Sequence, residues 1–319
     1  MKYLIKSLKI ILAFVMLIIA GVMLFFGHRD IALDELKEKY ANSESSFIAI
    51  DRMNIHYRDE GNPTDSIPIV LIHGTASSLH TFDIWADSLK QSKRVIRMDL
   101  PAYGLTGPFP DRNYSMDHYT TFVNNFLTAL GIEQCILAGN SLGGQIAWNY
   151  TIAQPNKVKK LILIDAAGYP LSSKSVPIAF KIGQTPVLNK LLTFITPRFL
   201  VKASIENVYF DKSKVNDLLV ERYFELTLRA GNRQAFVDRF GMLADTAYTN
   251  IKTIPQPTLI LWGANDLLIP VENAYKFHAD LPNDTLVLLD NTGHTPMEES
   301  PLESIAPVLH FLKNTQGKK

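Results

Sequence analysis

The sequence has little of what several classes of protein depend on. Cys135 is the only cysteine among 319 residues, which excludes an intramolecular disulfide framework and every zinc or iron–sulfur site built from several cysteines. Positive and negative charges nearly balance, since the chain has 32 lysine and arginine residues and 31 aspartate and glutamate residues. Four of the basic residues and one acidic residue lie in residues 1–30, which leaves 28 basic and 30 acidic residues elsewhere. Nucleic-acid binding needs a basic surface, so we exclude that class.

One long apolar run is present, at the N-terminus. Residues 10–26 read IILAFVMLIIAGVMLFF, without a polar side chain. As a helix this run would be about 25 Å long, slightly less than a hydrocarbon core of ~30 Å. We therefore expect an uncleaved, single-pass membrane anchor at residues 1–30. The alternatives are a signal peptide, although neither Ala20 nor Gly27 has a small residue two positions before it, and a buried core helix.

The charges beside the apolar run predict its orientation. Lys2, Lys6 and Lys9 precede the run, whereas only Arg29 follows it closely, beside Asp30. By the positive-inside rule the N-terminus stays in the cytoplasm. The main domain is then expected on the extracytoplasmic side, either periplasmic or external.

The remaining chain alternates expected strands with expected helices. Its composition, 47% hydrophobic and 20% charged, is that of a globular protein rather than a disordered one. Continuous apolar runs are typical of strands buried on both faces of a parallel sheet. Two short strands are expected at 47–50 and 55–58, and four such runs follow at 67–72, 94–98, 135–138 and 161–164. Two further strands are expected at 258–262 and 285–289. Helical spacing lies at 81–89, 116–130, 144–153, 271–281 and 302–313. This alternation predicts right-handed βαβ crossovers and an α/β fold.

Two segments interrupt this pattern. Residues 31–46 are charged and polar with helical spacing, and we interpret them as a short helix or stalk between the anchor and the domain. Residues 168–246 contain apolar residues at helical spacing, divided by prolines, and no clear strand. We predict a helical cap inserted into one α/β domain, whose two parts are residues 47–167 and 247–319. Inserts of this kind commonly cover an active site.

The turn at GNSLGG (139–144) carries the first chemical signal. An apolar strand precedes it and a helix follows, which is the setting that a G-x-S-x-G nucleophile motif requires. Such a tight turn strains the backbone of Ser141, and side chains at positions 139 and 143 would collide with the strand and the helix. The serine Oγ would then lie at a helix N-terminus, where partial positive charge favours an oxyanion. An ordinary βα turn is the alternative, and we predict Ser141 as a nucleophile.

A serine nucleophile needs a base, and the base needs an acceptor that fixes its tautomer. His294 lies between the last strand and the final helix, so its loop opens at the same sheet edge as Ser141. Asp266 follows the penultimate strand at that edge, and we predict that it orients His294. Asp165 and Asp290 also end strands and remain rivals for this role.

An oxyanion hole requires two backbone N–H groups. We assign one to Leu142, the residue after the nucleophile, and the other to Thr75, with Ala76 as its alternative. We expect no cofactor and no metal for this chemistry.

Six motifs together resemble those of the α/β-hydrolase family. They are LIHGTASS (71–78), DLPAYGLTG (99–107), GNSLGG (139–144), LILIDAAGYP (161–170), LWGANDLLIP (261–270) and NTGHTPMEESP (291–301). The resemblance extends over about residues 47–315. It implies an eight-stranded, mostly parallel sheet with a cap, the triad order Ser…Asp…His, and hydrolysis through an acyl-enzyme.

The same resemblance narrows the reaction. Epoxide hydrolases and haloalkane dehalogenases have an aspartate where Ser141 stands, so the chain is unlike them. Membrane-anchored monoacylglycerol lipases and cold-type bacterial lipases look similar and fit the apolar N-terminus. We therefore expect a membrane-anchored serine esterase or lipase that acts on a small-molecule ester or lipid. The alternatives are a carbon–carbon bond hydrolase of ring-cleavage diketones with the same triad, and a non-catalytic hydrolase-fold receptor.

Overall fold

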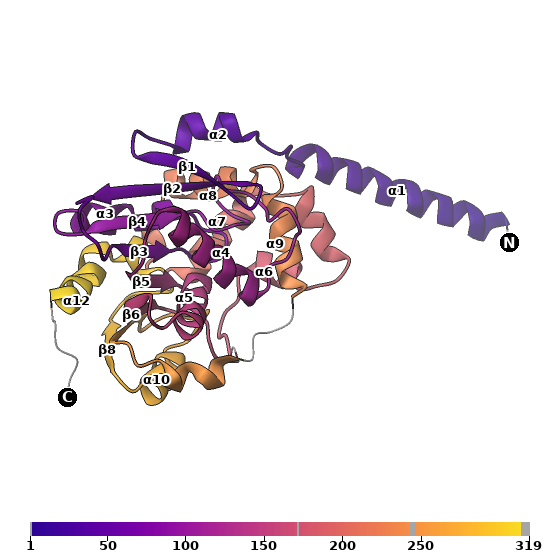
Figure 1. Ribbon diagram of the computed structural model, residues 1–319. Coiled ribbons are helices and arrows are strands. Elements are labelled where there is room, and N and C mark those ends of the chain that lie inside the picture. The colour runs from indigo at the N-terminus through magenta and orange to yellow at the C-terminus, as the bar shows by residue number, and fades with distance from the viewer. Residues whose placement is uncertain (1, 171, 243–246, 314–319) are drawn as a thin grey trace.

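An eight-stranded sheet forms the centre of the computed structural model, which describes residues 2–170, 172–242 and 247–313 (Figure 1). The strand order is β1-β2-β4-β3-β5-β6-β7-β8. The strands are β1 (Ser45–Ile50), β2 (Met53–Gly61), β3 (Ile69–Ile72), β4 (Arg94–Met98), β5 (Cys135–Asn140), β6 (Val158–Ile164), β7 (Thr258–Gly263) and β8 (Asp284–Leu289). β2 pairs antiparallel with β1 and β4, and the remaining pairs are parallel. The predicted eight-stranded, mostly parallel sheet is confirmed.

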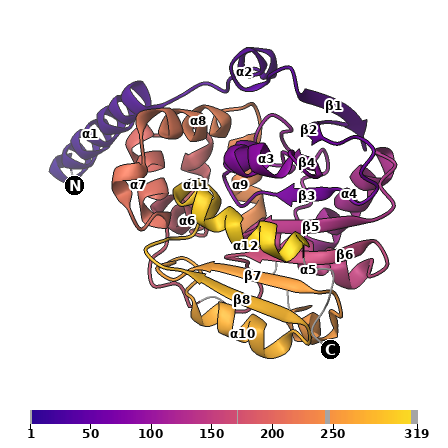
Figure 2. The same ribbon diagram turned by 90° about the vertical axis from the view of Figure 1, so that its left-hand side faces the viewer.

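Helices cover both faces of the sheet, which explains the continuous apolar runs. Every residue of β3, β5 and β7 is buried. Along β3, Ile69 and Leu71 pack with α3 (Asp83–Leu89) and α12 (Pro301–Lys313), on the face that Figure 2 presents. Val70 and Ile72 face the opposite way. Three helices pack on that side: α4 (Met116–Ala129), α5 (Leu142–Ala153) and α10 (Glu272–Asp280). Successive side chains of a strand point to opposite faces, so both faces must be apolar.

A group of helices between β6 and β7 forms the cap. Its elements are α6 (Ile178–Gly183), η2 (Leu188–Thr193), α7 (Arg198–Val208), η3 (Lys212–Lys214), α8 (Asp217–Thr227) and α9 (Asn232–Phe240). Within the described part of residues 168–246 no strand occurs. Pro177 and Pro197 directly precede α6 and α7, where a fixed φ suits the start of a helix. The expected cap boundary at residue 246 lies outside the described residues.

Short elements complete the loops at the carboxyl edge. They are η1 (Leu79–Phe82), η4 (Ala247–Thr253) and α11 (Pro296–Glu299). η1 and α11 follow β3 and β8, so they lie next to the predicted oxyanion loop and the predicted base.

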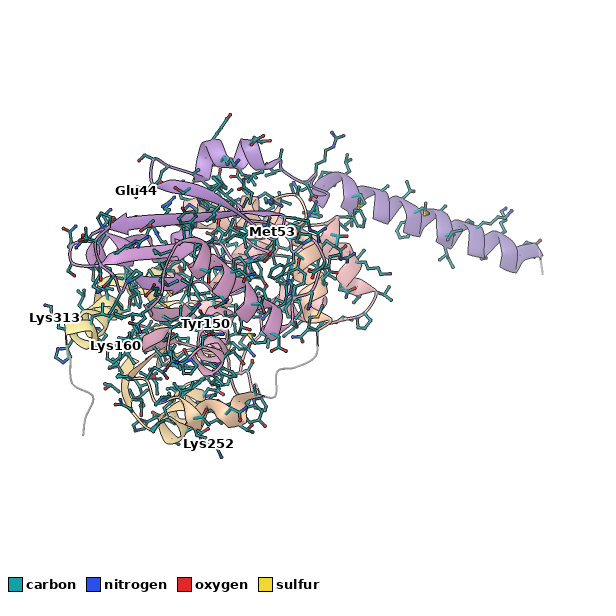
Figure 3. All side chains as sticks on the ribbon, viewed as in Figure 1. Glu44, Met53, Tyr150, Lys160, Lys252 and Lys313 are labelled. Atoms are coloured by element: carbon teal, nitrogen blue, oxygen red, sulfur yellow. The ribbon has the colours of Figure 1, made fainter. Side chains whose placement is uncertain are left out.

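The N-terminal apolar run forms the helix α1 (Lys2–Phe26), which projects from the body beside the cap (Figures 1 and 3). Within the described ranges, none of the helices reaches the combination of length and hydropathy that a membrane span requires. The structure thus does not support the predicted transmembrane helix within residues 1–30.

The segment expected as a short helix or stalk contains α2 (Leu33–Tyr40), and this helix packs against the domain. Leu36 is buried with Leu105 of the core and Leu226 of the cap. Lys39 and Tyr40 both contact the carboxylate of Glu225 on α8. α2 therefore joins the cap to the core at the surface.

Candidate active site

Ser141 occupies a strained turn between β5 and α5. Its backbone angles are φ 56° and ψ −116°, a conformation that L-residues rarely adopt. A Cβ at Gly139 would lie 2.2 Å from the carbonyl oxygen of Gly143, and one at Gly143 would lie 2.1 Å from that of Ile72. Both glycines are therefore sterically required. The geometry agrees with the collision that the sequence predicts for positions 139 and 143.

His294 and Asp266 meet at the carboxyl edge of the sheet. The Nδ1 atom of His294 lies 2.6 Å from Oδ2 of Asp266. Oδ1 of Asp266 accepts hydrogen bonds from the backbone N–H groups of Leu268, at 2.8 Å, and Ile269, at 3.0 Å. Because the carboxylate faces Nδ1, we assign the proton of the neutral imidazole to Nδ1. Nε2 of His294 is then free to accept a proton.

The two rival aspartates are placed differently. Asp165 directly follows β6, is fully buried and accepts a hydrogen bond from the backbone N–H of Gly263 at 2.9 Å through Oδ1. Burial, and after it the neighbouring Asp266 carboxylate, raises the pKa of Asp165 well above its usual range. Asp290 is exposed at the end of β8. Of the three aspartates, the structure brings only Asp266 into hydrogen-bond contact with His294.

Ser141 and His294 line one cavity of about 150 Å³. The hydrogen bonds of the described residues do not include one between these two side chains. Catalytic hydrogen bonds commonly shorten only when substrate binds, so a shared cavity is the relevant observation. The structure therefore brings the three predicted triad residues to one place.

The predicted oxyanion donors lie beside the nucleophile. Thr75 lines the same cavity, and a Cβ at the preceding Gly74 would lie 3.0 Å from Cβ of Ser141. Leu142 is the first residue of α5, so its N–H has no acceptor within the helix. Ala76, the alternative to Thr75, also lines the cavity and has φ 61°.

Distance alone would allow a cation between three of these side chains. Single ligand atoms of Asp165, Asp266 and His294 lie within 4.8 Å of one another. However, Nδ1 of His294 is already engaged by Asp266, and this hydrogen bond accounts for both groups. We assign no metal to this cluster.

Two residues that support the site escaped prediction. The side-chain amide of Asn140 donates to the carbonyl oxygen of His294 at 3.0 Å and to that of Ile164 at 3.2 Å. Glu299 accepts from the backbone N–H groups of Gly293 and Asp211, both at 2.7 Å. These bonds fix the loop of His294 against the nucleophile turn and against the cap. Both residues lie inside quoted motifs, GNSLGG and NTGHTPMEESP, which is the only signal that the sequence offered.

The cap supplies most of the cavity wall, and this wall is apolar. Its side chains include Phe180, Leu192, Ile195, Leu200, Val201 and Phe236. Arg233 is the only lysine or arginine among the described lining residues. Its guanidinium donates to Asp30 at 2.6 Å, to the carbonyl oxygen of His28 at 2.9 Å and to Thr196 at 3.3 Å. The charge of Arg233 is therefore paired with the segment that follows α1.

Comparison with known proteins finds that this chain is similar to hydrolases. A family model described as the alpha/beta hydrolase fold matches residues 67–301, which include every predicted site residue. The chain is 28% identical over 270 residues to the uncharacterized hydrolase YugF of Bacillus subtilis (strain 168), covering 83% of this chain and 96% of that protein. It is 27% identical over 257 residues to the 2-hydroxy-6-oxo-6-(2'-aminophenyl)hexa-2,4-dienoic acid hydrolase of Metapseudomonas resinovorans, covering 77% and 83%. The solved structure of a candidate lipase (lip1) of Acinetobacter baumannii AYE matches with a TM-score of 0.74 at 27% identity, covering 89% of this chain and 97% of that one.

Proposed function

Because this chain belongs to the α/β-hydrolase family, we propose that it is a serine hydrolase that cleaves carboxylic esters with an apolar acyl group. The observation that carries the proposal is the cavity, where Ser141 and His294 face an apolar wall. Burial of an acyl chain against such a wall contributes about 0.8 kcal/mol per CH₂ group. An ester with a medium or long acyl chain is therefore the substrate class that suits this site.

The proposed reaction uses five groups. Oγ of Ser141 attacks the ester carbonyl carbon while Nε2 of His294 takes the hydroxyl proton, and Asp266 stabilises the resulting imidazolium. The backbone N–H groups of Thr75 and Leu142 bind the oxyanion of the tetrahedral intermediate. This intermediate collapses to an acyl-enzyme, and the imidazolium gives its proton to the departing alcohol. A water molecule, deprotonated by His294, then releases the carboxylic acid in a second round of the same steps.

The alternative reaction is carbon–carbon bond hydrolysis, which the name of the Metapseudomonas relative favours. That relative acts on a dienoic acid, whose carboxylate would need a cationic partner in the site. The charge of Arg233 is already paired with Asp30, and no other lysine or arginine occurs among the described lining residues. This charge arrangement supports the ester as substrate.

We also propose that residues 1–30 attach the enzyme to a membrane, with the catalytic domain on the extracytoplasmic side. Exposed apolar side chains of α1 support this proposal: Ile10, Ile11, Leu12, Phe14, Met16, Leu17, Leu24 and Phe25. The cap continues this surface, because the ring of Phe26 contacts that of Phe199 with the centroids 5.7 Å apart. Phe194 and Phe199 are both 59% exposed. A lipid ester would then reach the cavity from the side of α1.

Cell fractionation tests the membrane proposal. The full-length chain should sediment with membranes and be released by detergent, and a protease added to intact spheroplasts should digest its catalytic domain. Full-length protein in the soluble fraction would contradict attachment, and protection from the protease would contradict the orientation.

A substrate panel tests the reaction. The purified enzyme should hydrolyse p-nitrophenyl esters, with kcat/KM rising from acetate toward longer acyl chains, and should leave a vinylogous diketone acid intact. Ser141→Ala should reduce kcat on the order of 10⁶-fold, by analogy with other triads. Ser88→Ala, which removes a hydroxyl on α3, is the matched control and should behave like the wild type. Cleavage of the diketone with no ester hydrolysis would favour the alternative reaction.

A fluorophosphonate probe tests for any serine chemistry at all. It should label the wild type and fail to label Ser141→Ala. An unlabelled wild type would indicate a non-catalytic receptor instead.

A further inference from the structure

Two carboxyl groups lie side by side behind His294. Asp165 follows β6 and Asp266 follows the neighbouring strand β7, with which β6 pairs in parallel. Asp165 is 0% exposed and Asp266 is 3% exposed. Their ligand atoms and that of His294 lie within 4.8 Å of one another. Two ionised carboxylates this close and this deeply buried would repel each other strongly.

The hydrogen bonds of the two groups are unequal. Asp266 accepts two backbone N–H bonds and the Nδ1–H bond of His294, and three such donors favour its ionised form. Asp165 accepts one bond, from Gly263 to Oδ1. Its Oδ2 is buried and has no hydrogen-bond partner among the described residues. A buried polar atom without a partner is costly, and a proton on Oδ2 would turn this atom into a donor, for which the neighbouring Asp266 carboxylate could be the acceptor.

The other charges near the pair do not favour a second carboxylate. No lysine or arginine of the described residues forms an ion pair with Asp165 or Asp266. The further charged group that acts on Asp165 is Glu299, another carboxylate. The cation available to the cluster is His294 in its protonated form, and its contact is with Asp266.

We propose that Asp165 is a neutral carboxylic acid that donates a hydrogen bond from Oδ2–H to the Asp266 carboxylate and so positions it for His294. Asp165 is then a fourth member of the hydrogen-bonded chain behind Ser141. It acts through Asp266, and its proton stays in place while His294 gains and loses one. The catalytic part of this proposal rests on the proposed serine hydrolase function, whereas the protonation of Asp165 does not.

The backbone at Asp165 makes asparagine the correct probe. Its φ is 43°, in the left-handed region that aspartate and asparagine tolerate better than other side chains. Asp165→Asn keeps the acceptor for Gly263 and supplies a neutral N–H donor toward Asp266. Asp165→Ala removes the donor.

The first experiment measures how the rate of fluorophosphonate labelling at Ser141 depends on pH. Asp165→Asn should label a few-fold more slowly than the wild type, with the midpoint of the acidic limb unmoved. Asp165→Ala should move that midpoint upward by about one pH unit, because an Asp266 carboxylate without its donor holds the imidazolium proton more tightly. An ionised Asp165 predicts a different result for Asp165→Asn. Removing a negative charge within 4.8 Å would then lower the midpoint by about two units, and this result would overturn the proposal.

Infrared difference spectroscopy provides a second measurement that needs no catalysis. At neutral pH the wild type should show the carbonyl band of a protonated carboxylic acid, and Asp165→Asn should lack it. Asp290→Asn, at the exposed aspartate after β8, is the matched control and should keep the band. A wild type without this band refutes the proposal, even if Asp165→Ala fails to fold. If the wild type shows the band but is never labelled, the serine hydrolase function fails and the protonation of Asp165 stands.

Discussion

Replacing Asp266 by asparagine removes the negative charge beside His294. The side-chain amide keeps an oxygen that accepts the N–H groups of Leu268 and Ile269. Its NH₂ group, however, would face the Nδ1–H of His294, so two donors would meet. The imidazole would then adopt the tautomer with its proton on Nε2, which cannot accept the proton of Ser141.

The structure sets the size of the expected loss. A unit charge 2.6 Å from Nδ1 stabilises the imidazolium by about 6 kcal/mol at an effective dielectric constant of about 20. The transition state carries most of this positive charge. We therefore expect kcat/KM to fall about 10⁴-fold, which corresponds to about 5.4 kcal/mol.

The assay is the initial rate of p-nitrophenyl ester hydrolysis by the wild type, Asp266→Asn and Asp290→Asn. Asp290 is the control because it is exposed after β8, and the carboxylate that pairs with His294 is that of Asp266. The reasoning is refuted if Asp266→Asn stays within tenfold of the wild type, or if Asp290→Asn loses as much activity.

Three further predictions follow from other parts of the molecule. Gly143→Ala should lower the free energy of unfolding by about 2 kcal/mol in urea titrations, because its Cβ would lie 2.1 Å from the carbonyl oxygen of Ile72; unchanged stability would contradict the steric argument. Leu200→Trp fills the cavity and should lower kcat/KM for a palmitoyl ester at least tenfold more than for an acetyl ester, whereas equal losses would remove the cavity as the acyl site. Burial raises the pKa of the Cys135 thiol to about 12, so the unfolded chain ionises first and the free energy of unfolding should fall as pH rises above about 8.5. A thiol reagent should therefore modify Cys135 only as the protein unfolds, and rapid labelling of the folded protein would contradict its burial.

The strands were predictable because both faces of the sheet are covered. Burial on two faces leaves an uninterrupted apolar run, and each expected run lies within or overlaps an observed strand. β6 starts at Val158, three residues earlier than the apolar run that begins at Leu161. Two lysines conceal this start, and the amine of Lys160 donates to the carbonyl oxygen of Phe311 at 2.8 Å. In the sequence, a lysine whose amine bonds to a distant backbone carbonyl group looks the same as a lysine in a loop.

The site was predictable only where the topology of the fold determines it. Ser141, Asp266 and His294 each follow a parallel strand, and the carboxyl ends of such strands meet at one edge. Asn140 and Glu299 escaped because their partners are mostly main-chain groups of loops distant in the sequence, which leave no local pattern. The variants Ser141→Ala and Asp266→Asn test the predicted catalytic roles of the serine and the aspartate.

The hydrogen bonds between Arg233 and the segment after α1 affect any shortened form of this enzyme. A chain that begins at residue 31 would lack both Asp30 and the carbonyl group of His28, so it would keep the guanidinium and lose its two closest acceptors. The acyl cavity would then contain an uncompensated positive charge. Fatty-acid anions, the products of the proposed reaction, would bind there and inhibit the truncated enzyme, although no residue of the triad had been altered.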